Sequence, residues 1–194
     1  MTFDVLHPLK KASDVFIANV VAYFIGVIIA VLGSLCLITI APFGYGLYYM
    51  AVKGTHGEKV EIKDVFHGFS SGMFVRSWVG LIGFSLIFFI VIFLGLISRF
   101  LEMSILFSFL SLIICFILLI FLFFTLYIYV MSPSEDILYA LKESIRISKS
   151  NIIATILTML VNAVFLALFV TAPIGLLFAV YVLKEIEPSI KDRS

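Results

Sequence analysis

Four long stretches of the chain contain no charged residue, and they dominate its pattern of apolar and polar positions. Residues 15–52, 77–98, 103–134 and 150–183 carry no Asp, Glu, Lys or Arg over 38, 22, 32 and 34 residues. A helix that crosses a bilayer needs about 20 apolar residues. The second and third stretches therefore predict one span each, whereas the first and fourth are long enough for two short arms.

Division of the two longest stretches predicts six spans in total. Glycine and serine at 33 and 34 favour a turn in the first stretch. Division of the fourth stretch into two arms of equal length places its turn near 166–168. The predicted spans are 16–33, 35–52, 78–98, 104–131, 151–166 and 168–183. The alternative is one full span in each long stretch, followed by a half-helix that starts at Pro42 or Pro173.

The basic residues favour the six-span arrangement and orient it. With six spans, twelve of the thirteen Lys and Arg residues fall on one side, and only Arg99 falls on the other. Cytoplasmic loops carry an excess of basic residues. We therefore expect a multi-pass protein of the cell membrane with both termini in the cytoplasm.

The composition agrees with a membrane location. Apolar residues make up 63% of the chain and charged residues 13%, against about 25% charged in soluble proteins. This excludes an ordinary soluble domain, and the net charge of +1 lacks the basic excess of a nucleic-acid-binding protein. Membrane lipids are the predicted partners. Cys36 and Cys115 lie in apolar runs and are interpreted as small hydrophobic residues.

Amphipathic segments between the spans predict helices that lie in the membrane interface. Ser132, Pro133 and Glu135 form a helix-start pattern with a capping box. Apolar residues then alternate with charged ones at helical spacing up to Lys149, which is typical of an interfacial helix. Residues 5–16 and 62–70 show weaker versions of this pattern.

A short motif occurs twice and suggests an internal duplication within a single domain, 1–194. Ala41-Pro42-Phe43-Gly44 corresponds to Ala172-Pro173-Ile174-Gly175, with Thr39 and Thr171 just upstream and Lys53 and Lys184 nine residues after each glycine. The predicted repeat units are 5–53 and 133–186, in parallel orientation. Coincidence in an apolar chain is the alternative, because few positions match.

The two proline motifs mark the predicted functional site. A proline inside a helix leaves a carbonyl without its usual partner, and in lipid that carbonyl needs another donor. We therefore expect kinks that face protein or a polar cavity. The residues predicted to form them are Pro42, Gly44, Pro173, Gly175, Asn162, Thr39 and Thr171. The alternative is that proline and glycine only allow close packing.

Small residues recur every fourth position in the first predicted span. Ala22, Gly26, Ala30 and Ser34 form this stripe. Such a stripe lets another helix approach closely. It predicts helix packing, and we expect it to support association with another membrane protein or with a second copy.

Asp, Glu, Lys, Arg and His are absent from the predicted spans, so no catalytic, cofactor-binding or metal-binding residue is predicted. Ion-coupled transporters and intramembrane enzymes usually place such groups at depth. His56, Glu58, Asp64 and His67 have no metal-ligand spacing and are interpreted as a solvated loop.

Two stretches of the chain together form a recognisable set of motifs. The first stretch runs from Ala41 to Leu47 and continues through Lys53-Gly54, Gly57-Glu58 and Asp64 to Phe69. The second comprises Ser132-Pro133, Ala140 to Ser144 and Ser148 to Ser150. Both resemble an uncharacterised polytopic membrane family distantly related to the membrane domain of glycerophosphoryl diester phosphodiesterases. The resemblance implies about six helices with interfacial helices between them, and it implies no catalytic residue.

Three classes of function are compatible with this sequence. The leading hypothesis is a non-enzymatic integral membrane protein that serves as a scaffold or accessory subunit of a membrane complex or homo-oligomer. The alternative is a transporter or permeation protein for a neutral or lipid-like small molecule, which would need a central polar cavity between the two hairpins. An enzyme that acts on lipid head groups through residues 53–76 is the least favoured class.

Overall fold

The computed structural model describes residues 4–100, 105–132, 136–167 and 171–188, and all regular secondary structure in these ranges is helical. The predicted all-α fold is therefore confirmed for the described part of the chain. Its elements are α1 (Leu6–Ala18), α2 (Val20–Gly33), η1 (Leu37–Thr39), α3 (Ile40–Thr55), η2 (Ile62–Phe69), α4 (Met73–Phe100), α5 (Ile105–Leu122), α6 (Thr125–Met131), α7 (Ile137–Ser150), α8 (Ile152–Ala167) and α9 (Ala172–Ile186), where η denotes a 3₁₀ helix.

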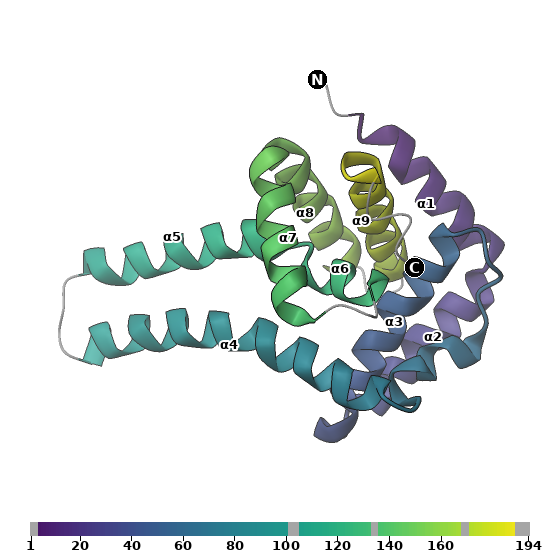
Figure 1. Ribbon diagram of the computed structural model, residues 1–194, viewed down its shortest axis with the longest axis horizontal. Helices are drawn as coiled ribbons and strands as arrows, with labels where there is room; N and C mark the ends of the chain where they lie inside the picture. Colours follow the sequence, from purple (N-terminus) through teal and green to yellow (C-terminus); the bar gives the residue numbers. More distant parts are fainter. Residues whose placement is uncertain (1–3, 101–104, 133–135, 168–170, 189–194) are drawn as a thin grey trace.

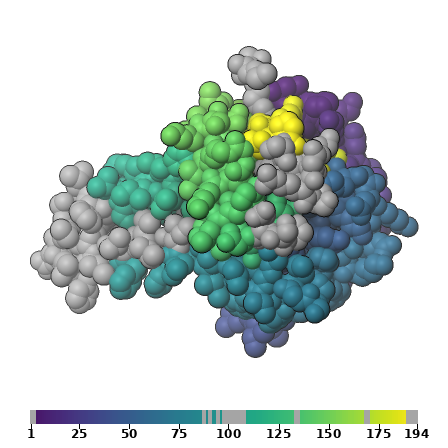
Figure 2. Space-filling model, viewed as in Figure 1, coloured from purple at the N-terminus to yellow at the C-terminus, as the bar shows by residue number. Residues whose placement is uncertain are grey.

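The molecule consists of a helical body and a long hairpin that extends from it. Helices α4 and α5 pack against each other and project away from the other helices (Figure 1). The space-filling view shows the same protrusion beyond the body (Figure 2). Large apolar side chains such as Phe93, Phe109 and Leu112 are exposed along it. The hairpin therefore presents an apolar surface that the rest of the chain does not cover.

Helices α3 and α9 form the centre of the body. They contact each other, and α2 and α8 pack outside them. Helices α2 and α3 form one helical hairpin, and α8 and α9 form the other. Met50 on α3 and Phe178 on α9 are fully buried. Val21 on α2 and Ile153 on α8 are exposed. Each hairpin thus has one buried arm and one arm with an apolar outer face.

One helical run in the described residues is long and apolar enough to cross a membrane. It covers 23 residues, Phe109–Met131, and includes most of α5 and all of α6. Two bent helix pairs reach the same criterion only when each pair is taken together: α1 with α2, bent by 86°, and α7 with α8, bent by 108°. The chain therefore has a candidate membrane-spanning helix, but the six predicted spans are not confirmed.

The sequence pattern located most helices correctly but not all of their ends. A helix corresponds to each predicted span, and the turn at Gly33-Ser34 is present at the end of α2. The predicted span 16–33 begins later, because the chain bends between α1 and α2 at Asn19. The predicted span 104–131 is broken at Phe123-Phe124, where α5 ends and α6 begins. The second predicted turn, near 166–168, lies partly outside the described residues.

Two bends of the same construction connect α1 to α2 and α7 to α8. The side-chain amide of Asn19 donates to the carbonyl of Val15 (3.1 Å), and that of Asn151 donates to the carbonyl of Ile147 (3.3 Å). Each asparagine ends one helix and precedes the next by one residue. The matching bends favour the predicted duplication of 5–53 and 133–186, which stays a prediction.

The segment expected as an interfacial helix at 62–70 has a different position. It forms η2, which packs along α3 from the level of Lys53 to that of Pro42. A Cβ added to Gly46 would lie 1.9 Å from the carbonyl oxygen of Val65, and one added to Gly68 would lie 2.1 Å from that of Pro42. Glycine at these two positions therefore lets η2 approach the α3 backbone directly.

The helix predicted to start at Ser132 starts later. Its N-cap is Asp136, whose carboxylate accepts a hydrogen bond from the amide of Tyr139 (2.8 Å). Ser132 is buried at the end of α6, and residues 133–135 lie outside the described ranges. The outcome is physically reasonable, because aspartate is as good an N-cap as serine.

Candidate functional site

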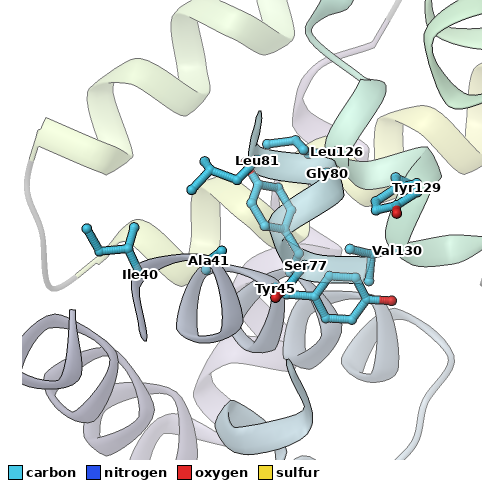
Figure 3. Close-up of a pocket in the computed structure, with 11 residues that line it drawn as sticks. Ile40, Ala41, Tyr45, Ser77, Gly80, Leu81, Leu126, Tyr129 and Val130 are labelled. Atoms are coloured by element: carbon cyan, nitrogen blue, oxygen red, sulfur yellow. The ribbon is translucent and has the colours of Figure 1, made fainter. Parts of the chain in front are cut away.

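A cavity of about 120 Å³ lies between α3, α4 and α6, where the hairpin joins the body. In Figure 3, Ile40 and Ala41 lie on one side of it, and Leu126, Tyr129 and Val130 lie on the opposite side. Its lining residues are Ile40, Ala41, Gly44, Tyr45, Tyr48, Ser77, Gly80, Leu81, Leu126, Tyr129 and Val130. The lining is mostly apolar and contains three tyrosine rings.

Arg76 fixes the base of the hairpin beside this cavity. Its Nη2 donates to the carbonyls of Tyr129 (2.7 Å) and Ser132 (2.9 Å), and its guanidinium carbon lies 3.9 Å from the centre of the Tyr129 ring. The Tyr129 hydroxyl donates in return to the carbonyl of Arg76 (3.1 Å). Hydrogen bonds from a charged donor are stronger than neutral ones, so this cluster joins α4 firmly to α6.

A buried ion pair holds η2 against the end of α3. The Nζ of Lys53 lies 2.9 and 2.8 Å from the two carboxylate oxygens of Asp64, and both side chains are largely buried. The carboxylate of Asp64 also accepts a hydrogen bond from the amide of Glu61 (2.7 Å). Burial alone lowers the pKa of Lys53, but the hydrogen bond and the charge of Asp64 outweigh it and raise that pKa. Lys53 is therefore charged at neutral pH.

His67 contributes an aromatic contact to the same interface. Its ring stacks on that of Tyr49, with centroids 3.7 Å apart and planes inclined by 8°. Burial lowers the pKa of His67, against a smaller raising effect of Asp64. The imidazole is therefore mostly neutral at pH 7 and packs as a flat ring.

The four residues that were interpreted as a solvated loop are not equivalent. Asp64 is buried, His67 is half-buried, and Glu58 is exposed. The Nδ1 of His56 lies 3.0 Å from the carbonyl of Val52. For Asp64 and His67 the interpretation was wrong, because η2 packs against α3 rather than extending into water. Among the described residues, no group of three or more His, Cys, Asp or Glu is arranged to hold a metal.

The predicted proline kinks do not occur. Pro42 is the third residue of α3 and Pro173 is the second residue of α9. Proline is tolerated in the first turn of a helix, because the amide hydrogen that it lacks has no partner there. Each proline therefore lies at a helix start, as in the half-helix alternative. The full span that this alternative places before each proline is not found in the described residues, where α2 and α8 have 14 and 16 residues. The carbonyl of Ile38, four residues before Pro42, accepts a hydrogen bond from the indole of Trp78 (3.2 Å).

The two threonines have the same role at the turns before α3 and α9. The hydroxyl of Thr39 donates to the carbonyl of Gly33, and that of Thr171 donates to the carbonyl of Phe165 (3.2 Å). Each bond reaches six residues back and closes the turn of its hairpin. Neither threonine lines the cavity.

Asn162 and Gly175 pack against each other inside the second hairpin. The amide of Asn162 donates to the hydroxyl of Tyr127 (2.7 Å), and a Cβ added to Gly175 would lie 2.5 Å from its Oδ1. That Oδ1 is buried without a hydrogen-bond partner in the described part of the chain. Of the seven residues predicted for a kink or cavity, only Gly44 lines the cavity.

The small-residue stripe packs within the chain. Ala22, Gly26 and Ala30 are buried against neighbouring elements of the body, and Ser34 is half-buried. A Cβ added to Gly26 would lie 2.9 Å from the terminal carbon of Met50 on α3. The stripe is therefore a helix-packing surface, but the expected contact with another molecule is not available there.

Sequence reasoning missed Arg76, Gly46 and Gly68. Arg76 directly precedes a charge-free stretch, and this position was the signal that it lies at the base of a long apolar helix. Gly46 and Gly68 had no such signal, because their role depends on contact between segments far apart in the sequence.

No protein-family model, no curated protein and no solved structure matches this chain. The resemblance to the polytopic family therefore stays a prediction, and the function must be argued from the geometry alone.

Proposed function

We propose that this chain is a non-enzymatic integral membrane protein that serves as a scaffold or accessory subunit. The observation that carries the proposal is the apolar α4–α5 hairpin extending from the body (Figure 1). Its α5 helix of 18 residues is about 27 Å long at 1.5 Å per residue, close to the ~30 Å hydrocarbon thickness. The length, composition and exposure of the hairpin all support its insertion in a bilayer.

The arrangement of the body favours fewer spans than six. In α2 and α3 there are 14 and 16 residues, so these helices are only about 21 and 24 Å long. Because η2 runs back along α3, α4 begins beside the first turn of α3, where Trp78 contacts the carbonyl of Ile38. Consecutive spans joined by a cytoplasmic loop would not meet in this way. We therefore propose that α4–α5 crosses the membrane and that α2–α3 and α8–α9 enter it from one side.

Both arrangements keep the two termini in the cytoplasm of a cell-membrane protein, because nearly all basic residues then share one side. They differ in the position of Cys36, an exposed free cysteine between α2 and α3. Six spans place Cys36 outside the cell, whereas our arrangement does not. The test is labelling of intact cells with a membrane-impermeant maleimide, in a Cys115→Ser background. We expect no labelling of Cys36 until the membrane is dissolved in detergent, and labelling of intact cells would contradict this arrangement.

The accessory role is supported by how the charged side chains of the body are used. Lys53 pairs with Asp64 between α3 and η2, and Arg146 on α7 contacts Glu187 at the end of α9 (2.6 Å). These contacts hold one element against another, as expected of a rigid support. The partner, in the simplest case a second copy of this chain, would contact the hairpin near the stacked, exposed rings of Phe89 and Phe93.

A photo-crosslinking amino acid at Phe93 tests for this partner in native membranes. The matched control is the same amino acid at Ile17, which is exposed on α1 of the body. We expect a crosslinked species larger than the chain for the first variant only, together with an oligomer or complex in native mass spectrometry. A strictly monomeric protein in both measurements would contradict the accessory role.

A permeation role for a neutral or lipid-like molecule is less well supported. It needs a path between the two hairpins, where α3 and α9 meet. Leu177 and Val180 of α9 are fully buried there, and Leu177 lies next to Gly54 of α3. A dense apolar contact of this kind favours a structural role.

A further inference from the structure

We infer that the cavity between α3, α4 and α6 binds part of the acyl chain of a bilayer lipid. The first observation is that its volume of about 120 Å³ is close to that of dry apolar cavities, ~150 Å³, that accept a benzene ring. The inference rests on the proposed membrane location but not on the accessory role.

Three of the four hydroxyl groups in the lining are engaged by the protein rather than by the cavity space. The Ser77 hydroxyl donates to the carbonyl of Phe74 (2.7 Å), and the Tyr129 hydroxyl donates to the carbonyl of Arg76 (3.1 Å). The Tyr45 hydroxyl interacts with the Arg76 side chain. Polar groups that are already hydrogen-bonded offer little to a polar ligand. The surface that remains favours hydrocarbon.

The two glycines of the lining differ in how much free space lies next to them. A Cβ added to Gly44 would meet no atom within 4 Å, whereas one added to Gly80 would lie 2.8 Å from the Tyr129 ring. The space therefore begins directly at the α3 backbone. Ile40, Gly44, Leu81 and Leu126 are only half-buried, so the cavity is open to the surface of the molecule.

The occupant follows from where the cavity lies. Leu126, Tyr129 and Val130 of its lining belong to the helical run Phe109–Met131, the candidate span. The medium beside that run is hydrocarbon in a bilayer, so the nearest apolar ligand at high concentration is a lipid tail. Filling an apolar cavity restores dispersion contacts that its lining otherwise lacks, which would stabilise the junction of hairpin and body.

The test uses nanodiscs that contain a phosphatidylcholine with a diazirine near the end of one acyl chain. On illumination, the diazirine loses nitrogen and the carbene inserts into a nearby bond, which mass spectrometry locates. We expect labels on Tyr48 or Tyr129 as well as on the exposed face of α2. In Gly44→Leu, whose side chain fills the cavity, labelling of the two tyrosines should fall by about ten-fold. Gly44→Ala, a smaller change, should lower it partly.

The matched control is Ala163→Leu, which introduces the same side chain at an exposed position of α8 and should leave the tyrosine labels unchanged. Labels on α2 without labels on Tyr48 or Tyr129 would overturn the inference, as would equal tyrosine labelling in Gly44→Leu. Tyrosine labelling that a free diazirine fatty acid produces and the phospholipid does not would overturn the assignment to a bilayer chain. Absence of labels from α2 and from the α4–α5 hairpin as well would instead contradict the membrane location.

Discussion

The substitutions Gly46→Ala and Gly44→Ala should have opposite effects on stability, although the two positions lie only two residues apart on α3. In both variants the higher helix propensity of alanine stabilises the helix by about 1 kcal/mol relative to glycine. At Gly46 the added Cβ would lie 1.9 Å from the carbonyl oxygen of Val65, and this backbone atom has no rotamer with which to move away. Overpacking of this kind costs about 1–3 kcal/mol and sometimes more. The clash at Gly46 involves a backbone atom and lies at the upper end of this range, about 3 kcal/mol. After the gain in helix propensity, Gly46→Ala should lower the free energy of unfolding by about 2 kcal/mol.

At Gly44 the added Cβ meets nothing within 4 Å, so the gain in helix propensity remains and stability should rise by about 1 kcal/mol. The measurement is reversible unfolding in mixed micelles, followed by the fluorescence of Trp78, the single tryptophan of the chain. Because the two variants make the same chemical change on the same helix, effects of micelle composition cancel in the comparison. Equal shifts in the two variants would refute the direct contact between η2 and α3.

The remaining predictions concern the polar contacts. Lys53→Met should lower the free energy of unfolding by about 2 kcal/mol, because Asp64 is then buried without its cation. Lys63→Met removes the lysine of an exposed ion pair and should leave the free energy of unfolding unchanged. Equal effects of the two variants would count against the buried pair. Tyr127→Phe should lower the free energy of unfolding by about 1–2 kcal/mol, because it leaves the buried amide of Asn162 without its acceptor, and an unchanged unfolding midpoint would contradict this bond. Burial lowers the pKa of His67, so the folded state disfavours protonation of this side chain. The contribution of His67 to the free energy of unfolding should therefore be fully present above the ordinary histidine pKa of about 6.5 and fall as the pH drops below it. This pH dependence of stability should be weaker in His67→Phe. An identical pH profile in the variant would refute the assignment of the pH dependence to His67.

The helices of this chain could be predicted from the sequence because they depend on local patterns. Runs without charge gave the positions of α2, α4 and α8 within a few residues, and Gly33-Ser34 gave the turn after α2. Proline was predicted to kink a helix, but Pro42 lies in the first turn of α3. The proline motif alone does not show where the helix begins. In the structure Thr39 is the N-cap of α3, and its hydroxyl donates to the carbonyl of Gly33.

The packing of η2 could not be predicted, and the topology depended on it. Residues 54–72 are polar enough to indicate a loop on the cytoplasmic side, and the six-span arrangement assumed such a loop. Only the contact of Gly46 with Val65, and of Gly68 with Pro42, shows that the segment returns along α3. Contacts between residues some twenty positions apart leave no periodic signal in the sequence.

The candidate site was predicted in part. Gly44 was selected because it belongs to a repeated motif, and it does line the cavity. Ala41 of the same motif and other residues of α3 line it as well. The remaining lining residues come from α4 and α6, which the motif does not include, and no local pattern brings the three helices together. Arg76, which joins α4 to α6, is recognisable as a junction only once both helices are placed.

The attachment of the hairpin at one end makes it a lever. Helix α4 has 28 residues and is about 42 Å long, so a rotation of about 5° at its first turn moves the far end by about 4 Å. Trp78 and Arg76 hold that first turn against the body, and Ser77 between them lines the cavity. A change in bilayer thickness that tilts the hairpin would thus reach the body at the point where these three side chains lie.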